Sequence, residues 1–311
     1  MRLIDLHCDT ASRIYKHKQS LEHNDYHISI DKLKQYAAYT QVMAIFISNR
    51  LSDDEGFVRF NNIYNYYMEE IAKHAGSVEN ITDGKQINEV WGAQKHAFVI
   101  GVEDARILNN DITKLQFLHQ KGVRLLTLLW SGQTCIGGSH NTQASLTPFG
   151  REVTKQCFEL GIVPDISHAS EQSASDMIEI AQSYSKPLIA SHSNSYSVYP
   201  HSRNLRDNHF LAIKELGGLV GISLCKYHLG GNECINVNHI LKHIDYYLSL
   251  GGENTVALGG DLDGTDLPDG FADIRDITKI ADNMAKNGYS DELINKLFWE
   301  NAKIFFENNI H

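Results

Sequence analysis

The chain is poor in cysteine, in proline and in concentrated positive charge. It has five cysteines and five prolines among 311 residues, and 28 basic against 38 acidic side chains, for a net charge of −10. No Lys/Arg-rich block or stripe is present, which argues against nucleic acid or an anionic membrane as a partner. The cysteines are odd in number, widely spaced and without a CxxC pair, so we expect no disulfide framework and a reducing cytoplasm: Cys8, Cys135, Cys157, Cys225 and Cys234.

The sequence also lacks the signals that take a protein to a membrane. No apolar run approaches the ~18–20 residues that cross a bilayer. The first residues show no basic region followed by an apolar stretch and a cleavage site, and the last residues carry no lipidation signal. There is no linker or low-complexity stretch, and 42% of the residues are hydrophobic. We therefore expect a cytoplasmic protein with one domain over residues 1–311.

Eight short apolar runs alternate with helical patterns along the chain. Most are continuous and rich in Val, Ile and Leu, as expected for parallel strands buried on both faces. The expected strands are Arg2–Leu6, Gln41–Ile47, Ala97–Val102, Val123–Leu129, Ile162–Ile166, Pro187–Ala190, Leu219–Leu224 and Thr255–Gly259. The expected helices are Phe57–His74, Leu115–Lys121, Phe149–Leu160, Ser170–Tyr184, Asn238–Ser249 and a last one that begins after Ser290. This alternation predicts an α/β fold, a (β/α)8 TIM-type barrel. A doubly wound open sheet is the alternative, and the lack of a GxGxxG turn after the first strand disfavours it.

Ionisable side chains follow several of these strands. In a barrel all the carboxyl ends of the strands meet on one face, where active sites are built. Two of the side chains, His7 and Asp9, are two residues apart and share a face of the first strand. Each alone has an ordinary structural explanation, but burying so many without a partner would be costly, and a cation removes that cost. The residues that we expect to converge are His7, Asp9, Glu103, His168, His192 and Asp261.

This set of nitrogen and oxygen ligands suits zinc best, with manganese, iron or cobalt as alternatives. Five ligands are too many for one catalytic zinc ion with an open position, and they suit two ions ~3.5–4 Å apart. Glu103 is the natural bridge, because a carboxylate has two oxygens. A hydroxide bridging the two ions would be nucleophilic at neutral pH, which predicts hydrolysis.

These residues occur in motifs that resemble the renal (membrane) dipeptidases, zinc dipeptidases of the metal-dependent amidohydrolase superfamily. The segments follow the family order over nearly the whole chain: Asp5-Leu6-His7-Cys8-Asp9, Ile100-Gly101-Val102-Glu103, Asp165-Ile166-Ser167-His168, the run from Ser191 to Val198, Ser202-Arg203-Asn204 and the run from Gly259 to Gly264.

The resemblance implies a role for each matched residue. His7 and Asp9 would bind one zinc ion, His168 and His192 the other, and Glu103 would bridge both. Asp261 would accept a proton from the bridging water and pass it to the leaving amine. Arg203, with Asn204 beside it, would hold the terminal carboxylate of a dipeptide substrate. The family's tolerance of a D-residue at the C-terminal position extends the expected substrates to L,D-dipeptides, and its dimers suggest a homodimer.

One position departs from the family's mammalian members. Where they have a histidine that stabilises the tetrahedral intermediate, this chain has Trp130. Indole offers one N–H and no charge, so Trp130 would instead form a wall of the substrate pocket. His140 is a candidate to take the place of the missing histidine. Since it shows no secretion signal and no anchor tail, the chain resembles a bacterial-type member of the family. Two alternatives stay open: hydrolysis of acyl-amino acids or lactams on the same metal core, and a non-catalytic barrel stabilised by metal.

Overall fold

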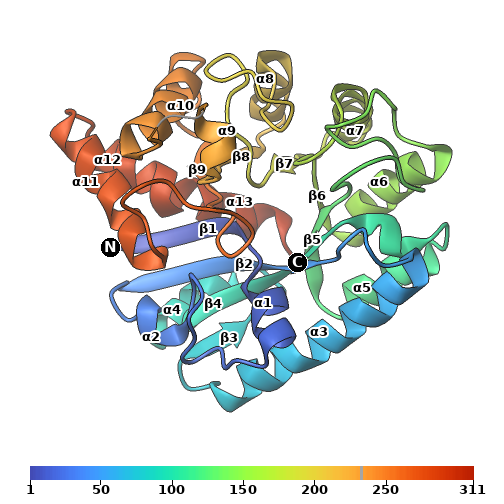
Figure 1. Cartoon of the computed structure of the whole chain (residues 1–311), viewed down its shortest axis with the longest axis horizontal. Helices are drawn as coiled ribbons and strands as arrows, with labels where there is room; N and C mark the ends of the chain where they lie inside the picture. The colour runs from blue at the N-terminus through green and yellow to red at the C-terminus, as the bar shows by residue number, and fades with distance from the viewer. Residues whose placement is uncertain (232–233) are drawn as a thin grey trace.

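The computed structural model describes residues 1–231 and 234–311, and a ring of parallel strands forms its centre (Figure 1). Eight strands close into a barrel in the order β2-β1-β9-β8-β7-β6-β5-β4, and pairing of β2 with β4 completes the ring. They are β1 Arg2–Cys8, β2 Ala38–Phe46, β4 His96–Glu103, β5 Val123–Thr127, β6 Val163–Asp165, β7 Ile189–Ala190, β8 Leu219–Ile222 and β9 Val256–Leu258. The predicted (β/α)8 barrel is confirmed. A short strand that the sequence did not predict, β3 Val78–Asn80, pairs with β4 outside the ring.

Helices surround the ring on its outer side (Figure 1). They are α1 Thr10–His17, α2 Ile30–Leu33, α3 Asp53–Lys73, α4 Gln86–Gly92, α5 Thr113–Gln120, α6 Pro148–Leu160, α7 Glu171–Tyr184, α8 Asp207–Glu215, α9 Lys226–Leu229, α10 Val237–Ser249, α11 Thr278–Lys286, α12 Asp291–Asn295 and α13 Asn301–Asn309. The Ser290 side chain accepts a hydrogen bond from the backbone of Leu293, as an N-cap does. The last predicted helix consists of α12, a π-helical turn over Lys296–Glu300 and α13 in succession.

Two apolar clusters pack inside and outside the ring of strands. The larger cluster lies between the strands and the surrounding helices. The smaller one fills the barrel interior with residues such as Ile4, Val42 and Val99, and it continues into Phe305 and Phe306 of α13. The apolar side chains of α13 therefore cover the end of the barrel formed by the amino ends of the strands. The ionisable residues that follow the strands lie at the opposite end. We call that end, where the carboxyl ends of the strands meet, the mouth of the barrel.

The first strand changes register just before the mouth. Its pairing with β2 shifts between Asp5 and Cys8. The Asp5 carboxylate accepts hydrogen bonds from the backbone N–H groups of His7 at 3.0 Å and Gly260 at 2.7 Å, which ties β1 to the segment after β9. The Cys8 side chain points into the larger apolar cluster beside Met43, as the strand period predicts. His7 is thereby held at the mouth.

Over the described ranges, no helix combines the length and the apolar character required to traverse a bilayer.

Candidate metal centre

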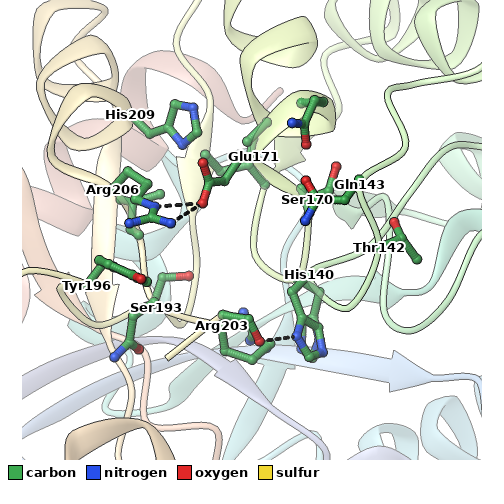
Figure 2. A pocket seen from close by; sticks show the side chains of 18 of the residues that line it. His140, Thr142, Gln143, Ser170, Glu171, Ser193, Tyr196, Arg203, Arg206 and His209 are labelled. Atoms are coloured by element: carbon green, nitrogen blue, oxygen red, sulfur yellow. Dashed lines mark hydrogen bonds and ion pairs between the residues drawn. The ribbon is translucent and has the colours of Figure 1, made fainter. Parts of the chain in front are cut away.

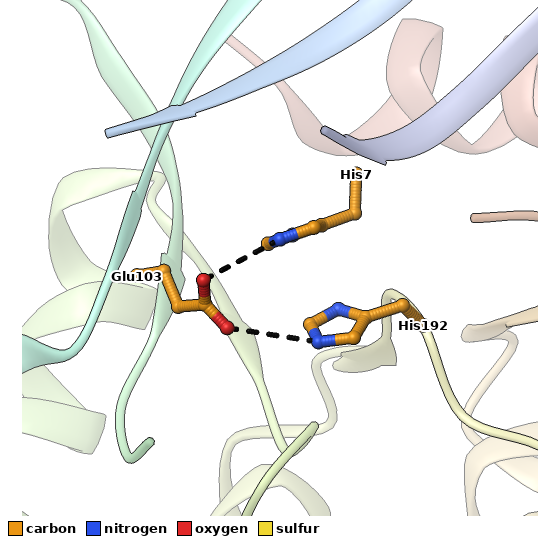
Figure 3. Close-up of side chains that lie close together, drawn as sticks. All are labelled: His7, Glu103 and His192. Carbon is orange, nitrogen blue, oxygen red and sulfur yellow. Dashed lines mark ion pairs between the residues drawn. The ribbon is translucent and has the colours of Figure 1, made fainter. Parts of the chain in front are cut away.

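Three imidazoles surround one carboxylate at the mouth of the barrel. Glu103 at the end of β4 lies between His7 of β1 and His192, which follows β7 (Figure 3). Its Oε2 is 3.6 Å from His7 Nε2, and its Oε1 is 3.7 Å from His192 Nε2. His168, which follows β6, places Nε2 2.9 Å from the same Oε1 and 2.9 Å from His192 Nε2. The two oxygens of Glu103 therefore face different histidines, which is the arrangement a bridging carboxylate requires.

Two aspartates complete the group on the side of His7. One ligand atom each of His7, Asp9 and Asp261 lie within 4.8 Å of one another, and so do those of His7, Glu103 and His192. In the described part of the chain, the buried atoms His7 Nε2 and Asp9 Oδ1 have no hydrogen-bond partner. Unpaired buried polar atoms that point at one another are costly, and a cation would satisfy them. The residues present therefore fit a metal site, and all six predicted residues converge.

The ionisable side chains of this group shift one another's pKa values. Burial alone would lower the pKa of His7, but Glu103, Asp9 and Asp261 raise it to about 10. Burial would raise the pKa of Glu103, but His7 and His168 hold it below its usual range. Burial lowers the pKa of His168 to about 4, with Arg203 contributing. At neutral pH His168 therefore presents a neutral nitrogen, as a metal ligand must.

Hydrogen bonds behind the candidate ligands orient two of the imidazoles. His168 Nδ1 lies 3.1 Å from the backbone oxygen of Trp130. His192 Nδ1 lies 2.7 Å from the hydroxyl of Ser191, which in turn donates to Asp165. An imidazole that donates from Nδ1 leaves the Nε2 lone pair free for a metal ion. Asp165 accepts three further hydrogen bonds, from the hydroxyl of Thr127 and from two backbone N–H groups, those of Ser167 and Ser191. Sequence reasoning did not assign this supporting role to Asp165.

The backbone is strained at the same place. His168 has φ 69°, Asp261 has φ 54° and Asp104, next to Glu103, has φ 81°. Non-glycine residues rarely adopt such values, and they cluster at functional sites where surrounding contacts enforce them. Asp263 also has φ 68°, but its carboxylate accepts hydrogen bonds from the hydroxyl of Thr10 and the backbone N–H of His27. Asp263 therefore fixes the loop after β9, and Asp261 is the aspartate that faces the group.

A cavity of about 720 Å³ opens over the candidate metal centre. Trp130 lines it, with its ring 4.8 Å from that of Phe46, and Arg203 lines it on another side. Arg203 is buried, and among the described residues its Nε has no hydrogen-bond partner. Asn204 uses its amide nitrogen to bind the backbone oxygens of Tyr199 and His228, both at 2.8 Å, which leaves its buried Oδ1 without a partner in the described chain.

A smaller pocket of about 340 Å³ adjoins this cavity (Figure 2). His140, His168 and Arg203 line both spaces, so they form the wall between them. His140 Nδ1 lies 2.9 Å from the hydroxyl of Ser202. Burial, with Arg203 adding to it, lowers the pKa of His140 to about 3, so this ring is a neutral hydrogen-bonding group.

Two further histidines of the cavity were missed in the sequence. His201 and His228 both line it, and their ring centroids are 4.7 Å apart. Neither follows a strand directly, because His201 lies in the loop after β7 and His228 on α9. The rule that located the other residues, a ligand-type side chain one step past a strand, could not find them. The lowered pKa of both, caused first by burial, keeps these rings uncharged beside Arg203.

The model of one protein family, described as membrane dipeptidase (peptidase family M19), matches residues 1–308. The chain belongs to this family of metallo-dipeptidases. The membrane dipeptidase motifs identified in the sequence are therefore those of a true member, and the chain is a metal-dependent hydrolase of dipeptides.

Individual proteins are similar to this chain in sequence or in fold. An uncharacterized protein in the pqqA 5' region of Klebsiella pneumoniae is 30% identical over 243 residues, which are 74% of this chain and 89% of that protein. The structure of dipeptidase AC, a metallopeptidase of family M19, superposes with a TM-score of 0.92 at 23% identity, covering 100% of this chain and 99% of that one. A metallopeptidase from Rhodobacter sphaeroides, liganded with a phosphinate mimic of L-Ala-D-Ala, superposes with a TM-score of 0.90 at 23% identity, covering 99% of both chains. At these identities the two structures establish a shared fold.

Proposed function

We propose that this member of the family binds two zinc ions and hydrolyses dipeptides, including those with a C-terminal D-residue. The observation that carries the proposal is the position of Glu103, whose two oxygens face His7 on one side and His168 and His192 on the other. One carboxylate with histidines at both oxygens, and Asp9 beside His7, would supply enough ligands for two ions.

The ligand assignment follows from these neighbours. His7 and Asp9 would hold one ion, His168 and His192 the other, and Glu103 would be shared between them. Bound zinc would supply a hydroxide at neutral pH and polarise the carbonyl of the scissile bond. Nitrogen and oxygen ligands also accept manganese, cobalt or iron, so metal analysis has to distinguish these ions.

Asp261 is the proposed proton carrier. Its burial is the largest cause that raises its pKa to about 7, and Glu103 adds to the effect. A carboxyl group with a pKa near the working pH can accept a proton from water and return it to the leaving amine. Its place among the ligand atoms of His7 and Asp9 puts it within reach of a water molecule held there.

Arg203 is the proposed anchor for the substrate carboxylate. A buried guanidinium with an unpartnered N–H in a cavity wall gains most from an anionic ligand, because a carboxylate can accept two parallel hydrogen bonds. Trp130 would wall the space for the substrate side chains, and Asn204 would hold the loop that carries Arg203. Recognition of both ends of a dipeptide would exclude longer peptides.

The proposal about D-residues has its support in the relative from Rhodobacter sphaeroides, whose ligand mimics L-Ala-D-Ala. The direct experiment measures hydrolysis of L-Ala-L-Ala, L-Ala-D-Ala and N-acetyl-L-alanine by zinc-loaded protein and by protein treated with a chelator. We expect cleavage of both dipeptides by the zinc-loaded protein only. Cleavage of the acetylated amino acid alone would instead identify an acyl-amino acid hydrolase on the same core.

A further inference from the structure

Besides Arg203, four cationic side chains line the cavity above the proposed metal centre. Arg13 and Lys16 lie on α1, Arg50 lies between β2 and α3, and Arg59 lies on α3. In residues 1–231 and 234–311, no carboxylate is within ion-pair distance of any of the four. We call these four residues the cation cluster. Its position is unexpected in a chain whose net charge is −10.

Nearby carboxylates are already engaged elsewhere. Asp53 pairs with Arg106 at 2.7 Å and Asp54 with Lys114 at 3.6 Å, while Glu55 caps its own helix through Ser52. The acidic residues that line the cavity do not neutralise the cluster either. Asp9, Glu103 and Asp261 belong to the metal centre, and Asp263 is bound by Thr10 and His27. The cluster therefore offers its charge to whatever enters the cavity.

Contacts within the protein hold two members of the cluster in place. Arg13 donates from Nε to the backbone oxygen of Asp263 at 2.7 Å, and the guanidinium of Arg59 lies 5.7 Å from the ring centroid of Tyr15. Lys16 and Arg50 are exposed. Two positioned guanidinium groups and two exposed cations form a surface suited to a carboxylate.

The barrel places this cluster across the mouth from Arg203. Arg203 follows β7, whereas the cluster follows β1 and β2. In the closed ring, β2 and β7 are four positions apart, which is the opposite side of an eight-stranded barrel. The metal centre lies between them, with ligands from β1, β4 and the segments after β6 and β7. A dipeptide whose terminal carboxylate is at Arg203 and whose peptide bond is at the metal centre extends its first residue toward the cluster.

We propose that the cation cluster recognises an acidic side chain on the N-terminal residue, so that aspartyl and glutamyl dipeptides are the preferred substrates. The inference rests on the proposed function, because it uses Arg203 and the metal centre to orient the substrate. A neutral first residue leaves the cluster unpaired and a lysine is repelled by it. The attraction between opposite, partly exposed charges at contact distance should raise kcat/KM by roughly tenfold.

The test compares L-Glu-L-Ala, L-Gln-L-Ala and L-Lys-L-Ala, three dipeptides of similar size, with the zinc-loaded protein. We expect kcat/KM for the glutamyl dipeptide to exceed that for the glutaminyl dipeptide about tenfold, and the lysyl dipeptide to be poorest. The preference should shrink at about 0.5 M salt, because mobile ions screen exposed charges. If the glutamyl dipeptide is cleaved no faster than the glutaminyl dipeptide, the inference is overturned, but the dipeptidase activity stands. Failure to cleave all three contradicts the proposed function itself.

A double variant, Lys16→Gln with Arg50→Gln, locates the preference. Both side chains are exposed, so the fold should tolerate the changes. We expect the ratio of kcat/KM between the glutamyl and glutaminyl dipeptides to fall at least threefold. Lys186→Gln is the matched control, because it removes an exposed charge outside the cavity and should leave the ratio unchanged. An unchanged ratio in the double variant would overturn the assignment to the cluster.

Discussion

Gly264 and Asp261 approach each other so closely that a Cβ atom on Gly264 would lie 2.2 Å from Asp261 Oδ1. The same atom would lie 2.3 Å from Asp9 Oδ2. Real Cβ atoms do not come this close to other heavy atoms, so only glycine fits between the two carboxylates. The position of the proposed proton carrier relative to a proposed metal ligand thus depends on a residue without a side chain.

Replacing Gly264 with alanine should therefore displace one or both carboxylates. We expect Gly264→Ala to lower zinc affinity and kcat/KM by about 10- to 100-fold, as changes around metal ligands do. Gly92→Ala is the control, since nothing lies within 4 Å of its added methyl group. Zinc titration and steady-state kinetics give the measurement, and wild-type values for Gly264→Ala would contradict the account.

The hydroxyl of Ser191 should matter for metal binding although it does not face the proposed ions. It connects His192 Nδ1 to Asp165, and these two hydrogen bonds leave His192 Nε2 free to bind metal. Ser191→Ala removes the connection, and we expect zinc affinity to fall about 10- to 100-fold with unfolding temperature little changed. Isothermal titration with zinc tests this prediction. Equal zinc affinities of the wild type and the variant would show that the hydrogen bonds of Ser191 do not orient His192.

Asp261→Asn should separate metal binding from turnover. Asparagine keeps the shape of the side chain but cannot carry a proton, so we expect both metal ions to remain and kcat to fall about 10²- to 10⁴-fold. In the wild type, activity should fall as the pH drops through the pKa of Asp261, because the protonated form cannot act as a base. The variant should lose this acidic limb. Full activity of the variant on every dipeptide would exclude Asp261 as the proton carrier.

Arg203→Ala should weaken recognition of the substrate carboxylate. We expect KM for a dipeptide to rise by at least tenfold, and KM for the same dipeptide with an amidated carboxyl end to change much less. The comparison of the two substrates separates a lost contact from a damaged pocket. Equal increases for both would remove the anchoring role from Arg203.

The architecture and the central residues could be predicted because they depend on short local patterns. Short apolar runs, most of them continuous and rich in Val, Ile and Leu, predicted all eight barrel strands, and parallel strands bring the residues after them to one end. That rule alone brought His7, Glu103 and His192 together, although they are far apart in the chain. The resemblance to a family added the roles of Arg203 and Asn204, which no local pattern assigns.

What the sequence could not predict depends on contacts between distant loops. His228 lies on α9 and reaches the cavity only because that short helix folds over the mouth. Asp165 looks like an ordinary strand residue until its partners Thr127 and Ser191 are known. The cation cluster likewise forms from α1 and the residues around α3, whose orientation relative to the barrel no periodicity determines.

Stability should also depend on pH through His243, far from the catalytic step. His243 is fully buried, accepts a hydrogen bond from the backbone N–H of Ser195 at 3.1 Å and lies 3.2 Å from the backbone oxygen of Leu229. Burial lowers its pKa to about 4. The unfolded chain, with a pKa near 6.5, therefore binds more protons between these two values, and the free energy of unfolding falls as the pH drops from about 6.5 to 4.

This contribution can be isolated with His243→Gln. The variant should be less stable at pH 7, and its free energy of unfolding should depend less steeply on pH between about 6.5 and 4, by up to ~1.4 kcal/mol per pH unit. Urea unfolding at several pH values measures both slopes. Parallel curves for the two proteins would show that His243 does not lose a proton on folding.

The number of bound metal ions tests the central claim most directly. Protein loaded with zinc and freed of excess ions should contain two zinc ions per chain by elemental analysis, and Glu103→Gln should bind markedly less, because the proposed bridge loses a charge. A wild-type chain that retains no zinc, or only one ion under saturating conditions, would contradict a binuclear centre.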